Sequence, residues 1–306
     1  MPDNLYKKQA ELLLRILPSV MREDVFALKG GTAINFFWRD YPRLSVDIDL
    51  TYLPIRDRDL SVLDISDRLA GIQARIERIF LQSSVIQKLD KTTRTILGLN
   101  IRERDATIKI ESNTVIRGSV YPPVKRKLSK KAEQEFNLSM TVTSLSLEDL
   151  YGGKIVAALD RQHPRDLFDI KLLLENEGLT DKIRKAFIVY LISHNRSLME
   201  VLDPGLQDIK TIFESDFVGM TSEPIKLDDL IETRAKLIEV IKQSLTEDEK
   251  KFLLSWKNKK PEWGLVGLEG IENLPGVKRR IQNLEGLVGD KHKRAYDKLE
   301  RYLLNK

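Results

Sequence analysis

Two carboxylates separated by one residue are the first pattern in the chain that could do chemistry. Asp47 and Asp49 lie within residues 44–52, where apolar and polar residues alternate as in a β-strand. The alternation places both carboxylates on one face, where solvent or a divalent cation must offset their repulsion. Mg²⁺ prefers one or two carboxylates together with substrate phosphates and water. Taken alone, an Asp-x-Asp pair more often marks a polar strand edge.

A glycine-rich turn precedes the acidic pair and changes this interpretation. Residues 25–28 are typical of a strand, and Gly30 and Gly31 allow a sharp turn and a close approach to a ligand. Thr32 is placed to cap a following helix, whose free N–H groups can bind a phosphate. The helix would be anchored in the core by Ala33, Ile34, Phe36 and Phe37. The combined pattern indicates a site for a metal-bound nucleoside triphosphate, and an ordinary strand–turn–helix is the alternative.

The same residues resemble the first motif of the nucleotidyltransferase superfamily, Gly-[Gly/Ser]-[Ser/Thr] followed by Asp-x-[Asp/Glu]. The matching positions are Gly30, Gly31, Thr32, Arg43, Ser45, Asp47 and Asp49. The sequence is similar to those of the AbiEii/AbiGii toxins, which include the MenT nucleotidyltransferase toxins, over most of residues 25–175. The resemblance implies an α+β fold, with a nucleotidyltransferase-like (polymerase β-type) mixed-sheet domain followed by an α-helical bundle domain.

A third carboxylate is the next candidate. Residues 95–101 and 106–115 form a predicted hairpin, and Lys109 and Glu111 share a face of its second strand. Nucleotidyltransferases often carry a third carboxylate on the strand beside the Asp-x-Asp strand, and Glu111 is the candidate here. It would complete the metal site or act as general base. The alternative is an exposed charge pair with Lys109.

The character of the chain changes at residue 146, where Ser146 and Asp149 match a capping box that opens a helix. We therefore divide the chain into a catalytic domain, 1–145, and a helical domain, 146–306, that completes the active site. Two glycines at 152–153 weaken the helix by about 1 kcal/mol each, which suggests that something passes close by. Lys154 follows them and would neutralise triphosphate charge; the alternative is a solvent-facing lysine.

A further helix begins at Pro164, a favourable first helical residue. It carries Asp166 and Asp169 as neighbours at i, i+3. In the AbiEii-like toxins a lysine from one helix and an aspartate from the next complete the site. By position Lys154 and Asp169 match best, Asp166 is the second candidate, and the sequence leaves open which aspartate faces inward. His163, in the preceding turn, is expected to be a cap or a surface residue.

Composition narrows the class of protein. The 306 residues suffice for about two domains, and 42% hydrophobic with 32% charged residues is normal for a globular protein. The absence of cysteine excludes disulfides, thiolate zinc sites and cysteine nucleophiles. No apolar run approaches the ~20 residues of a membrane span, and the first residues lack a signal-peptide pattern. We therefore expect no membrane association and a cytoplasmic location.

Positive charge is distributed unevenly. The net charge is +5; residues 117–131 hold six basic and no acidic side chains, and residues 256–306 hold twelve basic and seven acidic ones. Such segments suit RNA, although charge alone favours a solvated surface. Further elements are predicted at 4–17, ending before Pro18, and at 57–82, 140–144, 180–193, 205–213, 225–255 and 277–304.

The predicted reaction is transfer of a nucleoside monophosphate from an NTP to an acceptor, with release of pyrophosphate and with Mg²⁺, or alternatively Mn²⁺, as cofactor. Nucleotide binding is assigned to Lys29, Gly30, Gly31, Thr32, Ser45 and Lys154. Metal binding is assigned to Asp47, Asp49 and Glu111. The catalytic set is Asp47, Asp49, Glu111, Lys154, Asp166 and Asp169.

The family resemblance implies a toxin of a toxin–antitoxin or phage-defence (abortive infection) system that acts on tRNA at its 3′ end. It also implies a cognate antitoxin and no sequence-specific binding of DNA. Three alternatives stay open: modification of a protein hydroxyl, a nucleotide- or RNA-binding module without turnover, and a partner-binding protein with non-catalytic toxicity.

Overall fold

The computed structural model describes residues 4–286 and 289–304 and divides into two compact units. The first unit comprises Met1–Leu150 together with Glu214–Ile225, and the second comprises Tyr151–Phe213 and Lys226–Lys306. The division falls within helix α5 (Leu147–Arg161). The first unit therefore includes a short segment from much later in the chain. The predicted domain boundary at 145/146 stays a prediction.

The first unit is built on a seven-stranded sheet in the order β3-β4-β5-β2-β1-β7-β6. The strands are β1 (Phe26–Lys29), β2 (Asp47–Tyr52), β3 (Ser83–Leu89), β4 (Ile96–Glu103), β5 (Ala106–Asn113), β6 (Val124–Lys127) and β7 (Thr141–Ser144). The pairs β2–β5 and β1–β7 are parallel, and the remaining pairs are antiparallel. The predicted α+β class with a mixed sheet is confirmed.

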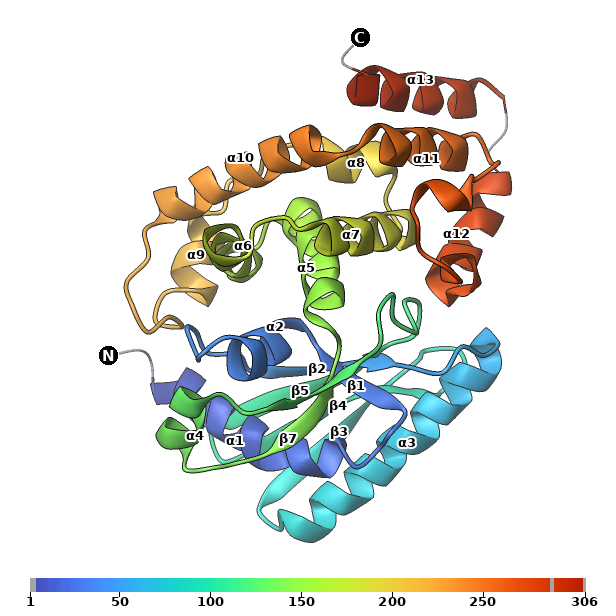
Figure 1. Cartoon of the computed structure of the whole chain (residues 1–306). Coiled ribbons are helices and arrows are strands. Elements are labelled where there is room, and N and C mark those ends of the chain that lie inside the picture. Colours follow the sequence, from blue (N-terminus) through green and yellow to red (C-terminus); the bar gives the residue numbers. More distant parts are fainter. Residues whose placement is uncertain (1–3, 287–288, 305–306) are drawn as a thin grey trace. The chain divides into compact units, whose positions relative to one another are not determined.

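Helices α1 (Asn4–Val20) and α3 (Arg58–Ile79) pack against the sheet from the same side (Figure 1). Their apolar residues recur at helical spacing; in α3 the buried ones are Ile65, Leu69, Ile72 and Ile76. Glu23, after α1, accepts hydrogen bonds from Arg68 and Arg75 of α3. This packing fixes the central strands, which carry the acidic pair.

Several local predictions need correction. Helix α1 continues through Pro18 to Val20, although proline lacks the N–H that would donate to the carbonyl of Leu14; the N–H of Met21 still donates to the carbonyl of Leu17. Strand β3 was not predicted, because most of its residues are exposed at the sheet edge. The basic segment 117–131, expected to begin as an irregular loop, also contains edge strand β6. It ends in α4 (Lys130–Phe136).

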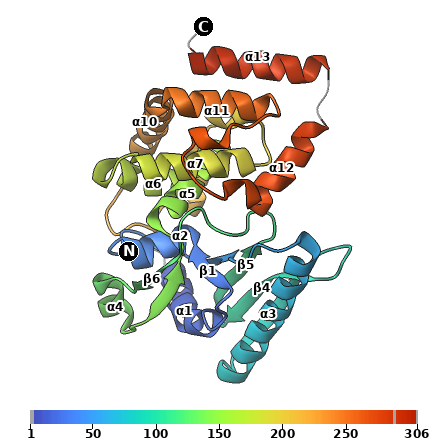
Figure 2. The same ribbon diagram turned by 45° about the vertical axis from the view of Figure 1, so that its right-hand side comes forward.

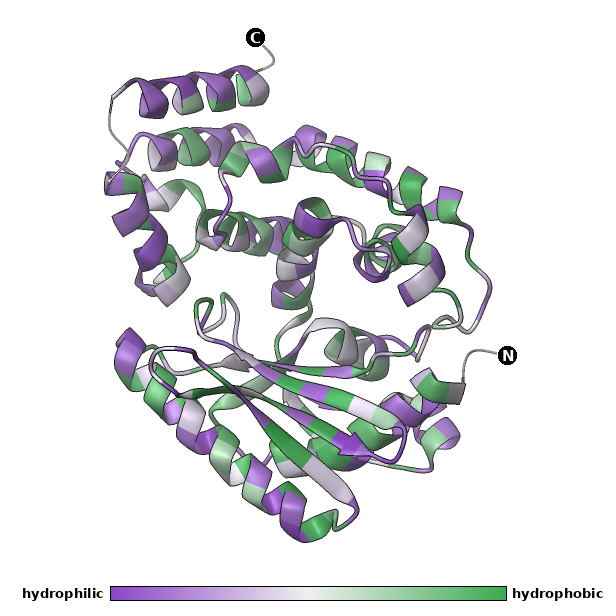
Figure 3. Cartoon of the chain, turned by 180° about the vertical axis from the view of Figure 1, so that it is seen from behind, coloured by the Kyte–Doolittle hydropathy of each residue, from purple (hydrophilic) through white to green (hydrophobic). Residues whose placement is uncertain are grey.

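The second unit is helical. Beyond α5 it contains α6 (Pro164–Asn176), α7 (Asp181–Ser193), α8 (Leu198–Leu202), α10 (Leu227–Ser244), α11 (Glu247–Lys257), α12 (Pro275–Glu285) and α13 (Asp290–Leu304), with α9 (Lys210–Asp216) at the unit boundary. Helices α11 and α13 lie side by side (Figure 2). Helix α13 is mostly hydrophilic (Figure 3), with Leu299 and Leu303 as its buried residues.

Most of the helices predicted in this part of the chain are present, but their first and last residues differ from the prediction. The predicted helix 225–255 is divided into α10 and α11, because Thr246 begins a new helix with a capping box to Glu249. Of the predicted 205–213, only the part from Lys210 onward is helical. The predicted 277–304 corresponds to α12 and α13, and residues 287–288 within it lie outside the described residues. None of the described helices is long and apolar enough to cross a membrane.

Candidate functional site

The glycine turn sits directly against the acidic strand. Gly30 has φ +71°, a conformation that side chains rarely adopt. A Cβ added to Gly30 would lie 2.4 Å from Oδ2 of Asp49. The absence of a side chain at Gly30 is therefore required twice, for the backbone turn and for the close approach of a carboxylate.

The turn leads into a short helical stretch, α2 (Gly30–Ala33), which continues as a π-helical segment η1 (Ile34–Trp38). The predicted anchor residues of this helix are confirmed as buried: Ala33, Ile34, Phe36 and Phe37. π-Helical turns are rare and occur frequently at functional sites. The apolar anchors hold the first helical turn rigidly next to β2.

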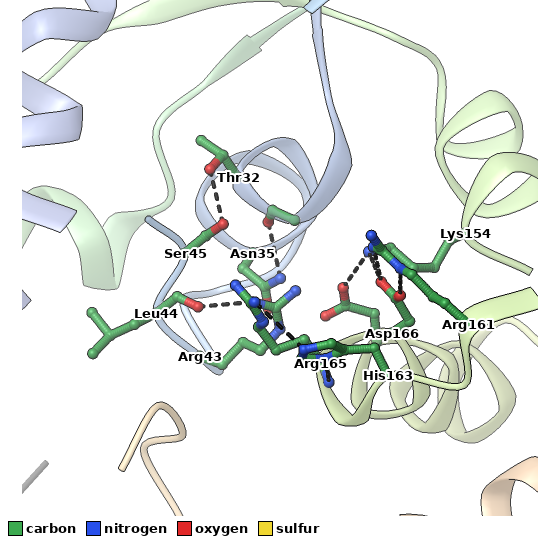
Figure 4. Close-up of polar contacts among 12 residues, drawn as sticks. Thr32, Asn35, Arg43, Leu44, Ser45, Lys154, Arg161, His163, Arg165 and Asp166 are labelled. Carbon is green, nitrogen blue, oxygen red and sulfur yellow. Dashed lines mark hydrogen bonds and ion pairs between the residues drawn. The ribbon is translucent and has the colours of Figure 1, made fainter. Parts of the chain in front are cut away.

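Thr32 does not cap this helix, which corrects the prediction. It is the third residue of α2 and is fully buried. Its Oγ1 donates a hydrogen bond to the backbone carbonyl of Asp47 at 2.6 Å and lies 2.9 Å from Oγ of Ser45 (Figure 4). The hydroxyl therefore ties the glycine turn to the start of the acidic strand.

The acidic strand is flanked by charged residues on both sides. Strand β1 places Lys29 opposite Asp49, and the parallel strand β5 places Lys109 beside Asp47 and Glu111 beside Asp49. Since cross-strand neighbours share a face of the sheet, the carboxylates of Asp47, Asp49 and Glu111 lie on one face. The sheet thus brings the first group of predicted residues together.

Glu111 has a different partner from the one expected. Its Oε1 lies 2.6 Å from Nζ of Lys88 on β3, and both side chains are about half exposed. The alternative of a pair with Lys109 is wrong. Within residues 4–286 and 289–304, no group of three or more His, Cys, Asp or Glu side chains is arranged to hold a metal ion. A role for Glu111 as third metal ligand stays a prediction.

Arg43 is part of this group, although the sequence motif that contains it gave it no role. Its side chain is only 3% exposed, and Nη1 donates to the carbonyl oxygen of Leu44 at 2.8 Å. A Cβ added to Gly31 would lie 2.7 Å from Nη2 of Arg43 and 3.1 Å from Oγ of Ser45. The guanidinium therefore lies against the second glycine of the turn.

A second cluster, in the second unit, surrounds Lys154. The ammonium lies 2.8 Å from Oδ1 of Asp166 and 3.0 Å from Oδ2 of Asp169. Lys154 is 7% exposed and the two carboxylates are 1% and 0% exposed, so the alternative of a solvent-facing lysine is wrong. Arg161 Nε donates to Oδ2 of Asp166 at 2.5 Å (Figure 4). The sequence left open which of the two aspartates faces inward; in the structure both contact Lys154.

The ionisation of Asp166 follows from these contacts. Burial alone would raise the pKa of its carboxyl group, but the charges of Lys154 and Arg161 and their hydrogen bonds outweigh burial. The pKa of Asp166 is held well below its ordinary value. The aspartate therefore stays ionised and holds the ammonium of Lys154 in place.

Local sequence explains how helices α5 and α6 present this cluster. His163 is confirmed as a cap, because its side chain accepts a hydrogen bond from the N–H of Arg165, and Pro164 occupies the first turn of α6. A Cβ at Gly152 would lie 2.8 Å from the backbone of Ala186 in α7, whereas one at Gly153 would lie 3.5 Å from the ring of Tyr190. The element that passes close to the glycines is therefore α7.

The predicted site residues thus form two clusters, one in each unit. The first contains Lys29, Gly30, Gly31, Thr32, Ser45, Asp47, Asp49 and Glu111, and the second contains Lys154, Asp166 and Asp169. Comparison with known families identifies the chain. The family described as the nucleotidyl transferase AbiEii toxin of type IV toxin–antitoxin systems matches residues 11–264.

The chain belongs to the AbiEii family.

As an AbiEii protein, the chain is a nucleotidyltransferase toxin of a type IV toxin–antitoxin system. Its structure is similar to that of MenT4, a nucleotidyltransferase toxin from Mycobacterium tuberculosis H37Rv, with a TM-score of 0.59, 14% sequence identity and 92% of each chain covered. At this identity the likeness shows a shared fold. A comparison with curated protein sequences finds no match.

Proposed function

We propose that this AbiEii protein transfers a nucleoside monophosphate from an NTP to an RNA acceptor, the 3′ end of a tRNA, with Mg²⁺ or Mn²⁺ as cofactor and with release of pyrophosphate. The observation that carries the proposal is that Asp47 and Asp49 share one strand face and that Asp49 lies directly against Gly30 of the turn. Carboxylates for a cation and a side-chain-free turn for phosphates are the two parts that such a reaction needs.

The residues present fit a hard divalent cation. Two carboxylates from one strand offer oxygen ligands, and Gly30 leaves room against Oδ2 of Asp49. Because Mg²⁺ is usually held by one or two carboxylates and completed by phosphates and water, a third protein ligand is not required. The cation, when bound, neutralises charge that develops on the attacking and leaving oxygens.

We assign Lys154 to neutralisation of the triphosphate, and Asp166 and Asp169 to positioning Lys154. Both carboxylates bind the ammonium, and the buried setting keeps that group in one orientation. A fixed positive charge is effective where negative charge accumulates in a transition state. Ser45 and Lys29 are assigned to the phosphates with the glycines, because they lie beside the turn.

Glu111 is proposed to accept the proton of the RNA hydroxyl. It lies in register with Asp49 and its side chain is about half exposed, so an acceptor can reach it. Lys88 must then share this carboxylate with the acceptor. If Glu111 acts in this way, Glu111→Gln should lower kcat and leave the KM for the NTP nearly unchanged.

An RNA acceptor is supported by charge. Four lysines of the segment 117–131 are exposed on β6 and at the start of α4, in the unit that holds the glycine turn: Lys125, Lys127, Lys130 and Lys131. Backbone phosphates bind such surfaces without regard to sequence. The family's toxin–antitoxin context adds a cognate antitoxin as partner. Because NTPs and tRNA are intracellular, the cytoplasm is the proposed place of action.

The test is incubation of the protein with each of four labelled NTPs and either total RNA or total protein, followed by sequencing of RNA 3′ ends. We expect label at tRNA 3′ ends and none with Asp47→Ala or Asp49→Asn. Asp67→Asn, which alters an exposed aspartate of α3, should behave as wild type. Label found only in protein would reject the RNA acceptor. Growth inhibition that survives Asp49→Asn would show that toxicity is not catalytic.

A further inference from the structure

One row of residues crosses the sheet through the proposed site. Strand pairing places Lys88 opposite Gly98, Gly98 opposite Glu111, Glu111 beside Asp49 and Asp49 opposite Lys29. The five residues come from five neighbouring strands, β3, β4, β5, β2 and β1. Because paired residues point to the same face of a sheet, the whole row lies on the face that carries the acidic pair. Lys88, at one end of this row, has no role in the assignments above.

From this row we infer that Lys88 binds a backbone phosphate of the acceptor RNA, beside the hydroxyl whose proton Glu111 accepts. The inference rests on the proposed function, because it adds an acceptor-binding residue to the same site. Lys29, at the opposite end of the row, is assigned to the phosphates of the NTP. The row then has the nucleotide at one end and the RNA at the other, with Asp49 and Glu111 between them.

The contact between Lys88 and Glu111 passes over a strand. Neighbouring strands lie about 4.8 Å apart, so the backbones of these two residues are separated by two spacings, roughly 10 Å. Nζ of Lys88 nevertheless lies 2.6 Å from Oε1 of Glu111. Gly98 lies between the two in the row and has no side chain to obstruct the lysine. The ammonium therefore lies at the carboxylate that is proposed to accept the proton, and RNA that reaches Glu111 also reaches Lys88.

The charge of this face calls for a cation on the acceptor side. RNA carries a negative charge on each phosphate, and Asp47, Asp49 and Glu111 already place three carboxylates on the face. Like charges repel at such distances unless a positive group offsets them. The proposed metal ion offsets the charge of the NTP, and Lys109 shares the face but is in register with Asp47. Lys88 contacts Glu111 from the β3 side, away from Asp49, where it can offset the charge of the RNA.

The ion pair is weak enough to be exchanged for a contact with RNA. The side chains of Lys88 and Glu111 are 57% and 44% exposed, and surface pairs of this kind contribute little to stability. An ammonium has three N–H donors on a flexible stem, so it can contact the carboxylate and a phosphate oxygen at once. In the free protein Glu111 thus holds Lys88 near the position that the phosphate takes, and little is lost when the phosphate binds.

The first experiment measures steady-state transfer of label from the NTP to tRNA by the full chain, with each substrate varied in turn. We expect Lys88→Gln to raise the KM for tRNA by about 3- to 10-fold, the effect of one exposed phosphate contact, and to leave the KM for the NTP unchanged. Lys88→Arg should retain most of the affinity, because it keeps the charge. Lys8→Gln is the matched control, since Lys8 forms a similar exposed pair with Asp105, between β4 and β5. This control should behave as wild type.

The division between KM and kcat separates this role from a purely structural one. A lower kcat with an unchanged KM for tRNA would mean that Lys88 acts on Glu111 alone and would overturn the inference. An equal rise of both KM values would also overturn it, because a distorted sheet affects both substrates. Near-UV circular dichroism checks the fold of each variant. Lys88→Thr, a residue type that suits a strand, replaces Lys88→Gln if the latter is not natively folded.

The second experiment measures binding without turnover. Filter binding of tRNA in the absence of NTP is followed over a series of salt concentrations, with intact tRNA and with tRNA shortened by a few nucleotides at its 3′ end. We expect Lys88→Gln to lower the slope of log K against log salt for intact tRNA by about 0.7, the contribution of one contact to single-stranded phosphate. Shortened tRNA should bind wild type and Lys88→Gln with the same slope. The inference is rejected by an unchanged slope for intact tRNA, or by an equal loss with both forms of tRNA.

Failure of this inference and failure of the proposed function give different results. If the wild type binds the 3′ end of tRNA through Lys88 but transfers no label, the proposed reaction fails and the phosphate contact of Lys88 stands. If the wild type transfers label to tRNA and Lys88→Gln changes neither the KM for tRNA nor the salt dependence of binding, the reaction stands and Lys88 is not an acceptor-binding residue.

Discussion

The ammonium group of Lys154 contacts two buried carboxylates, those of Asp166 and Asp169. Its contacts to Asp166 and Asp169 bring three ionised groups into a region that is almost closed to water. A buried ion cluster of this kind adds little stability compared with apolar side chains of similar volume. The cost of removing its charges from water offsets the attraction between them. Loss of Lys154 alone removes the positive charge that faces two buried carboxylates, of which Asp166 keeps Arg161 as a partner.

We therefore predict that Lys154→Met destabilises the protein by about 3–5 kcal/mol, in addition to the loss of its proposed role at the triphosphate. The measurement is urea unfolding at pH 7. Lys171→Met is the matched control: it removes a lysine that pairs with Glu175 on the outer part of α6. Because partly exposed pairs contribute about 0–1 kcal/mol, a similar loss in both variants would contradict the buried-charge explanation.

The depressed pKa of Asp166 gives a pH-dependent prediction. Burial acts to raise this pKa, but Lys154 and Arg161 hold it below the ordinary value of about 3.9. The unfolded chain therefore binds the proton at higher pH than the folded protein. The resulting stabilisation is complete above about pH 4 and is lost only as the pH falls through the lower folded value.

The test is urea unfolding of wild type and Asp166→Asn from pH 7 to pH 2.5. We expect the difference in unfolding free energy to be constant down to about pH 4 and to narrow below it, because the wild type alone must then protonate this carboxylate. A difference that narrows already between pH 7 and pH 5 would assign the effect to a group that titrates higher.

At the scale of elements, helix α5 depends on its contact with α7. Gly152→Ala places a Cβ 2.8 Å from the Ala186 backbone, which cannot move away without displacing α7, whereas Gly153→Ala places it at an ordinary contact distance of 3.5 Å from Tyr190. We predict that Gly152→Ala lowers stability by about 1–3 kcal/mol through overpacking. Gly153→Ala should gain up to about 1 kcal/mol from helix propensity. Thermal unfolding of the two single variants measures both, and equal shifts would contradict this packing.

Strands with a clear pattern of apolar residues could be predicted from the sequence, and strands without one could not. Strands β1 and β2 were predicted because buried residues such as Phe26, Ile48 and Leu50 follow the pattern of a sheet interior. Strands β3 and β6 lie at the two edges of the sheet, where most side chains face solvent and leave no such pattern.

The candidate site divides in the same way. The acidic pair and the glycine turn could be predicted, because their chemistry depends on residues close together in sequence. The hydrogen bond from Thr32 to the backbone of Asp47 could not, since a threonine after a turn equally suits a cap. The pairing of Arg43 with Thr221 joins residues nearly 180 positions apart, and no local pattern encodes such a contact.

At the scale of the whole molecule, the first unit is discontinuous in sequence, and this bears on where the chain can be cut. A fragment that ends at 145 or 150 lacks Glu214–Ile225, with its buried Phe217 and Met220. The hydrogen bonds to Pro42 and Leu44 would be lost with it. The glycine turn and the acidic pair are therefore best studied in the full chain.

The structure distinguishes the two basic segments, 117–131 and 256–306, that the sequence offered equally as RNA-binding surfaces. In the segment 117–131, Arg117 is buried and Arg126 stacks 4.1 Å from the centroid of the Trp38 ring, so exposed lysines carry its remaining charge. In the segment 256–306, Lys257 is buried and helix α13 holds many exposed cations. The segment 117–131 shares its unit with the glycine turn and the acidic pair, whereas the other segment does not.

We predict that RNA binding depends on the first surface. Simultaneous change of Lys127, Lys130 and Lys131 to Gln should reduce the slope of log K against log salt by roughly 2, since each contact to single-stranded phosphate contributes about 0.7. The matched control changes Lys291, Lys293 and Lys298 of α13, which are equally exposed. Filter binding of tRNA over a series of salt concentrations measures both. A slope that falls only in the α13 variant would place the RNA on the second unit.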